Sequence, residues 1–168
     1  MLPRDLGDGL VLRRATVDDT DRLADFNATI HGNDGEPDEW VGVWTRDMMR
    51  GDHPTTGVDD FLIVEETRTG AIASSLCMIP QQWSYNGIPF SVGRPEMVGT
   101  HLDYRRRGLV RAQFEVIHAL SAKRGETVQV ISGIPWYYRQ FGYEMALELD
   151  AGRFGYPANV PALEEGAT

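Results

Sequence analysis

The fold is decided by the stretch Tyr104-Arg105-Arg106-Arg107-Gly108-Leu109-Val110-Arg111, which joins a predicted strand to a predicted helix. Glu96 to Leu102 has the apolar character of a strand, and Leu109 to Lys123 has apolar residues at helical spacing. A helix that begins after three arginines and a glycine combines free backbone N–H groups, the positive end of the helix dipole and guanidinium groups. The stretch predicts a site for an anion such as a pyrophosphate, and Gly108 lets that anion approach the backbone.

Length and composition restrict the class of protein. The chain has 168 residues, enough for one domain with a substantial core, and its 42% apolar and 24% charged residues are typical of soluble globular proteins. No apolar run approaches the ~20 residues of a membrane span, and the N-terminus lacks the features of a signal peptide. The single Cys77 excludes an intramolecular disulfide, and Cys and His are too sparse for a structural zinc site. We therefore expect a cytoplasmic enzyme or binding module without a membrane partner or a metal.

The distribution of charge restricts the kinds of partner that the protein is expected to bind. The formal net charge is −9, yet arginines gather at 105–107 and 111. A compact basic cluster on an acidic protein favours a local anion site over a nucleic-acid surface, which normally spreads further. Acidic residues are concentrated between Asp18 and Glu39. They form either a solvated surface or an acidic mouth that attracts a cationic substrate.

The order of elements follows from periodicity, caps and turn residues. Strands are expected at 10–15, 61–66, 71–79 with a continuation over 82–86, 88–102 with a break around 93–95, 127–134 and 143–150; helices are expected at 16–30, 38–50, 109–123 and 136–141. The order β-α-α-β-β-β-α-β-α-β predicts an α+β fold, with a central mixed, mostly antiparallel, twisted sheet of six to seven strands flanked by helices. Residues 151–168 are expected to form a C-terminal arm or tail.

Two motifs and this order resemble the GNAT superfamily of acyl-CoA-dependent N-acetyltransferases. Arg105–Val110 matches the family's phosphate-loop pattern Gln/Arg-x-x-Gly-x-Gly/Ala except at its last position, where this chain has Val110. Tyr138–Tyr143 is similar to the Tyr-x-x-Phe-Gly-Tyr segment of Eis-type aminoglycoside acetyltransferases, which often have Arg-Arg-Arg-Gly-Leu-Leu-Arg at the loop. The resemblance covers about residues 10–150. It implies either one GNAT-like domain over 1–168 or the first domain of a longer Eis-like protein.

The resemblance also implies an activity and a cosubstrate. It predicts transfer of an acetyl group from acetyl-CoA to a primary amine of a small, cationic acceptor, by direct attack in a ternary complex. A non-catalytic acyl-CoA sensor is the alternative, and a homo-oligomer is left open. In the family the pantetheine arm adds like a short strand beside the strand before the loop. The implied cofactor-binding residues are Val98, Gly99, Thr100, Arg105, Arg106, Arg107, Gly108, Leu109, Val110 and Arg111. Gly99 either marks a bulge that opens the sheet or is a weak point in a strand.

Tyr138 matches the family tyrosine near the coenzyme sulfur, and a phenol is a suitable proton donor to a thiolate. The resemblance therefore implies that Tyr138 is the general acid.

Three candidates remain for the general base: Glu96, a water, or His101. Strict alternation along the strand places the Glu96 side chain on the same face as Val98 and Thr100, and His101 on the opposite face. The fold also implies an acceptor pocket formed by His31 to Trp40, with Trp44, Trp83 and Tyr85 as walls.

Overall fold

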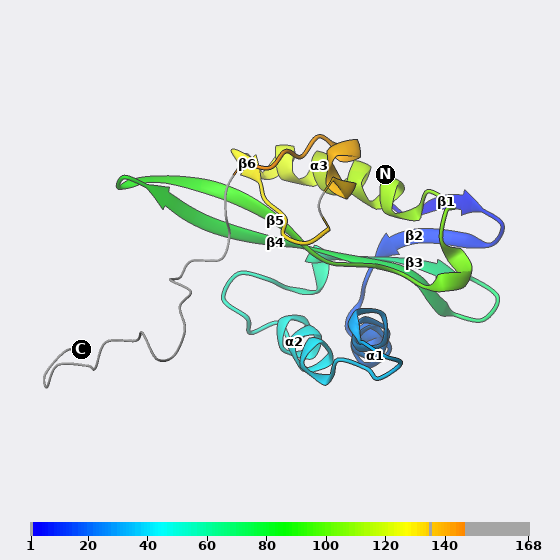
Figure 1. Ribbon diagram of the computed structural model, residues 1–168. Coiled ribbons are helices and arrows are strands. Elements are labelled where there is room, and N and C mark those ends of the chain that lie inside the picture. Colours follow the sequence, from blue (N-terminus) through cyan, green and yellow to red (C-terminus); the bar gives the residue numbers. More distant parts are fainter. Residues whose placement is uncertain (1, 135, 147–168) are drawn as a thin grey trace, which may run out of the picture.

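The computed structural model describes residues 2–134 and 136–146, and it has three layers (Figure 1). A six-stranded sheet with the order β1-β2-β3-β4-β5-β6 lies between α3 on one face and α1 with α2 on the other. The strands are β1 (Arg4–Gly7), β2 (Leu10–Arg14), β3 (Phe61–Glu66), β4 (Ala71–Tyr85), β5 (Ile88–Thr100) and β6 (Val128–Gln129); the helices are α1 (Thr20–His31), α2 (Glu39–Met49) and α3 (Leu109–Arg124). All pairs are antiparallel except β5 with β6. The predicted mixed, mostly antiparallel sheet flanked by helices is confirmed.

Short 3₁₀ turns connect these elements. They are η1 (Val17–Asp19), η2 (Val58–Asp60), η3 (Leu102–Tyr104) and η4 (Tyr137–Phe141). The last of these corresponds to the helix expected at 136–141. Its C-terminal residue is followed by Gly142, which has a φ of 92° and ends the turn.

Three strand predictions were wrong in detail. β1 was not predicted, because most of its residues are exposed and no apolar alternation marks it. β6 has two residues, where the pattern predicted a strand over 127–134. Within the predicted strand 143–150, residues 143–146 form no strand, and 147–150 lie outside the described residues.

The expected break of the strand around 93–95 is absent, because β5 runs on through Pro95 to Thr100. The carbonyl of Gly93 accepts a hydrogen bond from Val130 N, so the backbone groups of Gly93 face β6. Pro95, two residues further on, faces the same edge, where β5 has already lost its neighbour. A proline nitrogen at that edge breaks no ladder hydrogen bond, so the strand continues.

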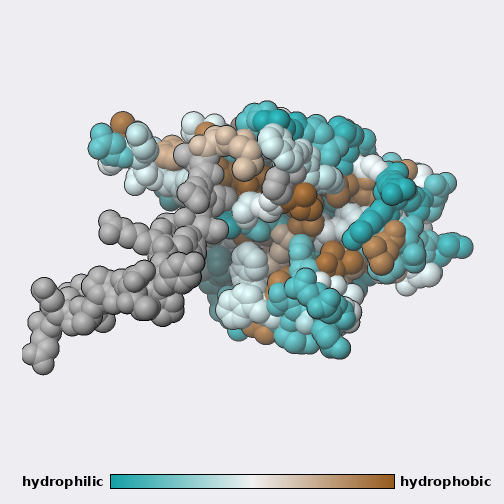
Figure 2. Space-filling view, in the orientation of Figure 1, coloured by the Kyte–Doolittle hydropathy of each residue, from teal (hydrophilic) through white to brown (hydrophobic). Residues whose placement is uncertain are grey.

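Each face of the sheet has its own apolar core. On the α3 side, Phe114 and Ile117 pack with Leu12, Leu62 and Leu76. On the other side, Leu23 and Met48 pack with Phe61, Ile63 and Cys77. In the space-filling view of Figure 2, hydrophobic residues lie along the seam between the two helical layers, whereas the outer surfaces are mostly hydrophilic.

Two helices bury faces that include polar or small residues. On α3 the buried residues are Leu109, Ala112, Gln113, Phe114, Ile117 and Ser121, while Ala119 is exposed and Val116 and Leu120 are half-buried. On α2, Trp40 is 73% exposed. Gly42 and Thr45 are buried there instead, and Gly42 allows close packing because a β-carbon on it would lie 3.4 Å from Ala28 Cβ.

A buried carboxylate fixes the connection between β2 and α1. Asp19 is only 3% exposed at its side chain, and it accepts hydrogen bonds from Arg13, Arg22 and the backbone N–H of Thr16. Arg13 and Arg22 also pair with Glu65 on β3. The hydrogen bonds from these arginines and from Thr16 hold the pKa of Asp19 below its ordinary value, although burial opposes this shift. The ionised carboxylate therefore stabilises the folded state.

We expect Asp19→Asn to lower the free energy of unfolding by about 2–3 kcal/mol at pH 7, because it leaves two partly buried guanidinium groups without their shared carboxylate. The folded-state pKa of Asp19 lies below the reference value of 3.8, so this stabilisation is complete above that pH and is lost as the pH falls below it. Urea unfolding of both proteins at pH 7 and pH 3 should therefore show a smaller difference at pH 3.

The matched control is Asp18→Asn, which removes the same charge from the neighbouring, exposed residue. It should change the unfolding free energy by less than about 0.5 kcal/mol. Equal effects of the two substitutions would contradict the role assigned to Asp19.

Candidate active site

A cleft opens where β5 and β6 separate. The two strands pair only at Val92 with Val128 and Gly93 with Gln129, after which one further hydrogen bond joins Val130 N to Gly93 O. From Arg94 onward, β5 has a free edge within the described residues. The cleft has a volume of about 870 Å³ and lies between this edge, residues 131–134, η4 and the start of α3.

A bulge in β5 lies at the wall of this cleft. Ser75 pairs with Gly99 and Cys77 pairs with Glu96, so β5 has one residue more than β4 over this interval. Met97 has a φ of 52°, in the left-handed region. The bulge therefore lies at Met97 and Val98, next to Gly99 and not on it.

The bulge decides which backbone groups face the cleft. Beyond it, His101 N donates to Ala73 O, so the backbone groups of Gly99 and His101 point toward β4. Because backbone groups alternate between the two edges of a strand, those of Val98 and Thr100 point to the free edge. This edge can accept an extended chain as an additional strand.

The start of α3 forms the second wall. Ala112 N donates to Gly108 O, which leaves the N–H groups of Leu109, Val110 and Arg111 without a partner inside the helix. Gly108 has a φ of 74°, and a β-carbon on it would meet no atom within 4 Å. The backbone here is thus open to the cleft, as a close-fitting anion requires.

The arginines of this segment are held in different ways. Arg105 Nε donates to Thr100 O at 3.3 Å, Arg107 pairs with Asp8 at 2.9 Å, and Arg111 donates to Gln140 Oε1 at 2.9 Å. Arg106 is exposed, with a φ of 62°, and its side chain makes no hydrogen bond to any described residue. Every cofactor-binding residue that the sequence predicted lines this one cleft.

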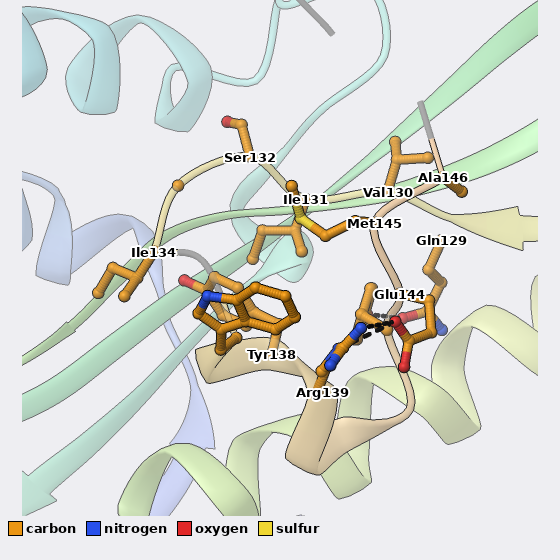
Figure 3. A pocket seen from close by; sticks show the side chains of 13 residues that line it. Gln129, Val130, Ile131, Ser132, Ile134, Tyr138, Arg139, Glu144, Met145 and Ala146 are labelled. Atoms are coloured by element: carbon orange, nitrogen blue, oxygen red, sulfur yellow. Dashed lines mark hydrogen bonds and ion pairs between the residues drawn. The ribbon is translucent and has the colours of Figure 1, made fainter. Parts of the chain in front are cut away.

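Tyr138 enters the cleft from η4 and also borders a smaller cavity of about 250 Å³. Figure 3 shows this cavity, with Tyr138 and Arg139 on η4 and the ion pair of Arg139 with Glu144 at one side. The Tyr138 ring packs against Phe114 of α3, with the centroids 5.9 Å apart. Burial, assisted by Tyr137 and Glu96, raises the pKa of Tyr138 to about 12. The phenol therefore keeps its proton at neutral pH.

Glu96 also lines the cleft, but on a different face from the one predicted. It lies opposite Cys77, which packs in the core below the sheet, whereas Val98 packs against the core on the α3 side. The prediction that Glu96, Val98 and Thr100 share one face was wrong, because the extra residue at the bulge reverses the alternation. Arg94 Nε donates to Glu96 Oε1 at 2.6 Å.

His101 does not line the cleft. Its Nδ1 accepts a weak hydrogen bond of 3.4 Å from Asp103 N, so it caps η3 at the exposed end of β5. Because its ring is engaged in this cap and does not line the cleft, His101 is a poor candidate for the base.

His31 was not predicted to be catalytic, yet this residue lines the cleft at the C-terminal end of α1. The ring is half-buried, and burial lowers its pKa, while the Met97 carbonyl and the carboxylates of Glu96 and Asp38 oppose this shift. The one indication in the sequence was that His31 directly precedes Gly32, the residue that ends α1.

The predicted aromatic walls of an acceptor pocket do not line either cavity. Trp83 packs against Phe90 on the projecting β4–β5 hairpin, and Tyr85 is 79% exposed near its tip (Figure 1). Trp44 packs against the core below the sheet. Of the predicted pocket residues, only His31 borders the cleft.

Among the described residues, no helix is both long and apolar enough to cross a membrane. Within the same residues, no three His, Cys, Asp or Glu side chains are grouped so that they could hold a metal ion.

Solved structures share this fold at low identity. A glucosamine-6-phosphate N-acetyltransferase from Arabidopsis thaliana is 14% identical, with a TM-score of 0.63 over 87% of this chain and 99% of that one. An aminoglycoside N-acetyltransferase in complex with CoA is 13% identical, with a TM-score of 0.63 over 92% and 99% of the two chains. A probable N-acyltransferase from Enterococcus faecalis is 15% identical, with a TM-score of 0.62 over 80% of this chain but 32% of its own.

No curated protein matches the chain significantly. The family model of the GNAT acetyltransferase domain matches residues 11–146, which include the whole cleft. The two walls of the cleft are the free edge of β5 and the start of α3, which are the strand and the helix that the loop motif joins. The chain belongs to the GNAT acetyltransferase family.

Proposed function

We propose that this protein transfers an acetyl group from acetyl-CoA to a primary amine of a small cationic acceptor. The observation that carries the proposal is the cleft in which the free edge of β5 and the unpaired N–H groups of α3 meet. A ligand that combines an extended polar arm with a pyrophosphate needs both features in this order. Family membership, and a neighbour of the same fold in complex with CoA, support coenzyme A as that ligand.

The residues present fit coenzyme A. The N–H groups of Leu109, Val110 and Arg111 would bind the pyrophosphate, and the exposed Arg106 would add charge. Val98 and Thr100 would pair with the pantetheine arm through their backbone groups. Val110, in place of the family's Gly or Ala, packs its side chain against the core on the α3 side and leaves its N–H available.

Two requirements of acetyl transfer can be assigned to side chains. Acetyl-CoA supplies the thioester, whose C–S bond breaks as the new C–N bond forms. Tyr138 holds a proton at its phenol oxygen and would donate it to the departing sulfur. Glu96 would attract the cationic acceptor, through the carboxylate oxygen that Arg94 does not engage, to the end of the cleft away from Arg105 to Arg107. The amine must also lose a proton, which Glu96, a water or another group would accept.

Two narrower readings belong to the same proposal. The chain is proposed to act as one domain over 1–168. The second reading is that the chain is the first domain of a longer Eis-like protein; the fit to 32% of the Enterococcus faecalis chain shows that a domain of this fold occurs within a longer chain.

The decisive experiment is thermal unfolding with acetyl-CoA, CoA and ATP, followed by a thiol-release assay with a panel of primary amines. A ligand at 100 times its Kd should add ~2.7 kcal/mol to the stability. Stabilisation by both CoA forms together with thiol release supports the enzyme. Stabilisation without thiol release from any amine would favour the acyl-CoA sensor instead.

Gly108→Leu should weaken CoA binding at least tenfold, because the new side chain projects into the space through which the phosphates reach the backbone. Calorimetric titration with CoA measures this. The matched control is Gly125→Leu at the other end of α3, where φ is 68° and a β-carbon would also meet nothing within 4 Å. Both substitutions carry the same left-handed strain of about 1–2 kcal/mol. Equal CoA affinities of the two variants would refute the phosphate-loop assignment.

Tyr138→Phe should lower kcat about 100-fold and leave CoA affinity unchanged, because it removes the proton donor but keeps the ring against Phe114. Steady-state kinetics and calorimetry separate the two effects. Tyr143→Phe is the control, since its hydroxyl donates to Gln129 and it borders only the smaller cavity. If the two variants have the same kcat, Tyr138 is not the acid.

A further inference from the structure

We propose that His31 is the general base that takes the proton from the acceptor amine, through its Nδ1 atom. This inference rests on the proposed acetyl transfer and assigns the one proton movement that the transfer leaves open.

Gly99 brings His31 to the reacting end of the cleft. A β-carbon on Gly99 would lie 2.6 Å from Ile30 Cγ2 and 3.7 Å from His31 Nε2. Only a glycine therefore lets the last turn of α1 pack directly on β5, one residue beyond the bulge. The His31 ring lies beside the strand between Val98 and Thr100, whose backbone groups face the proposed pantetheine arm.

The surroundings of the ring leave one of its two nitrogens accessible. Nε2 is buried beside Gly99 and makes no hydrogen bond to any described residue. An acceptor amine cannot reach a buried nitrogen, which leaves Nδ1 as the proton acceptor and the proton of the neutral ring on Nε2. Nδ1 is neither hydrogen-bonded within the described residues nor among their buried unpartnered atoms, so it is open to the cleft that the ring lines.

The charges around the ring suit a base that works near neutral pH. Burial lowers the pKa of His31 below 6.5, so the ring is neutral and able to accept a proton. Glu96 on β5 and Asp38 before α2 are the carboxylates that act on it, and Tyr138 faces the same cleft from η4. Once protonated, the ring lies at the C-terminal end of α1, where the helix dipole favours a positive charge.

A primary alkylamine is mostly protonated at neutral pH, so it first loses one proton to solvent and attacks as the free base. As the amine nitrogen then forms its bond to the acetyl carbon, a second proton passes from it to His31 Nδ1. The C–S bond breaks, and the sulfur takes a proton from the Tyr138 phenol. Glu96 is a positioning residue in this scheme, because Arg94 already engages one of its oxygens at 2.6 Å.

The test is the pH dependence of kcat/KM, calculated for the free-base form of a primary alkylamine, for wild type, His31→Gln and Glu96→Gln. Wild type should lose activity as the pH falls through a pKa below 6.5. His31→Gln should remove this acidic limb and lower kcat/KM about 100-fold at pH 7, with unchanged CoA affinity. Glu96→Gln should keep the limb and raise KM for the amine. His101→Gln, at the exposed cap of η3, should match wild type.

Two outcomes overturn the inference in distinguishable ways. A wild type that acetylates amines while His31→Gln keeps the acidic limb refutes His31 alone. A wild type that acetylates no amine removes the proposed function and the base with it. Nitrogen-15 NMR of the wild type gives a measurement independent of folding effects in the variants. It should show a neutral Nε2–H tautomer that titrates below 6.5, and an Nδ1–H tautomer would contradict the assignment.

Discussion

The left-handed conformation of Met97 is the constraint on which the cleft depends. A non-glycine residue with positive φ costs free energy and persists only where its surroundings determine it. Here the Met97 side chain is buried under α1 and α2, and its sulfur accepts a hydrogen bond of 3.4 Å from Asn27. The Ser75 hydroxyl in turn donates to Asn27 Oδ1 at 2.6 Å. The Thr45 hydroxyl on α2 donates to the same sulfur at 3.3 Å. Buried polar groups on α1, α2 and β4 thus hold the bulge in place.

Two properties of the cleft follow from this bulge. It turns the backbone groups of Val98 and Thr100 to the free edge, and it moves Glu96 to the face that carries α1. Without it, the carboxylate would point toward α3 and away from His31. The separation of β5 from β6 at Gly93 then supplies the space into which the two faces open.

Most of the fold could be predicted because its signals are local. Thr16 and Asp38 mark helix starts, Asn86-Gly87 marks the hairpin, and Tyr104–Arg111 joins a strand to a helix in one continuous motif. Its residues line one cleft because they are neighbours in sequence. The GNAT resemblance rested on the same local motifs, and the match over residues 11–146 confirms it. Tyr138 borders the cleft as the second motif predicted, and its chemical role stays a prediction.

What could not be predicted depends on contacts between distant segments. The bulge is invisible in Glu96-Met97-Val98-Gly99, because Asn27 and Ser75 impose it from other elements. Strict alternation therefore placed Glu96 on the wrong face. His31 becomes a site residue only because Gly99, far along the chain, lacks a side chain. Trp83 and Tyr85 were expected to line a pocket, yet the length of β4 and β5 carries them out along the hairpin (Figure 1).

The close packing of α1 on Gly99 also means that the two sides of the cleft come from separate parts of the chain. The donor side of the cleft is built from one continuous segment, so its sequence can change little without losing its shape. The opposite corner is contributed by Ile30 and His31 at the end of α1, and the turn that follows them closes tightly at Gly32 against Glu36 and Pro37. Substitutions in that turn can shift the end of α1, and so reshape this corner, while the wall formed by β5 and the start of α3 stays intact.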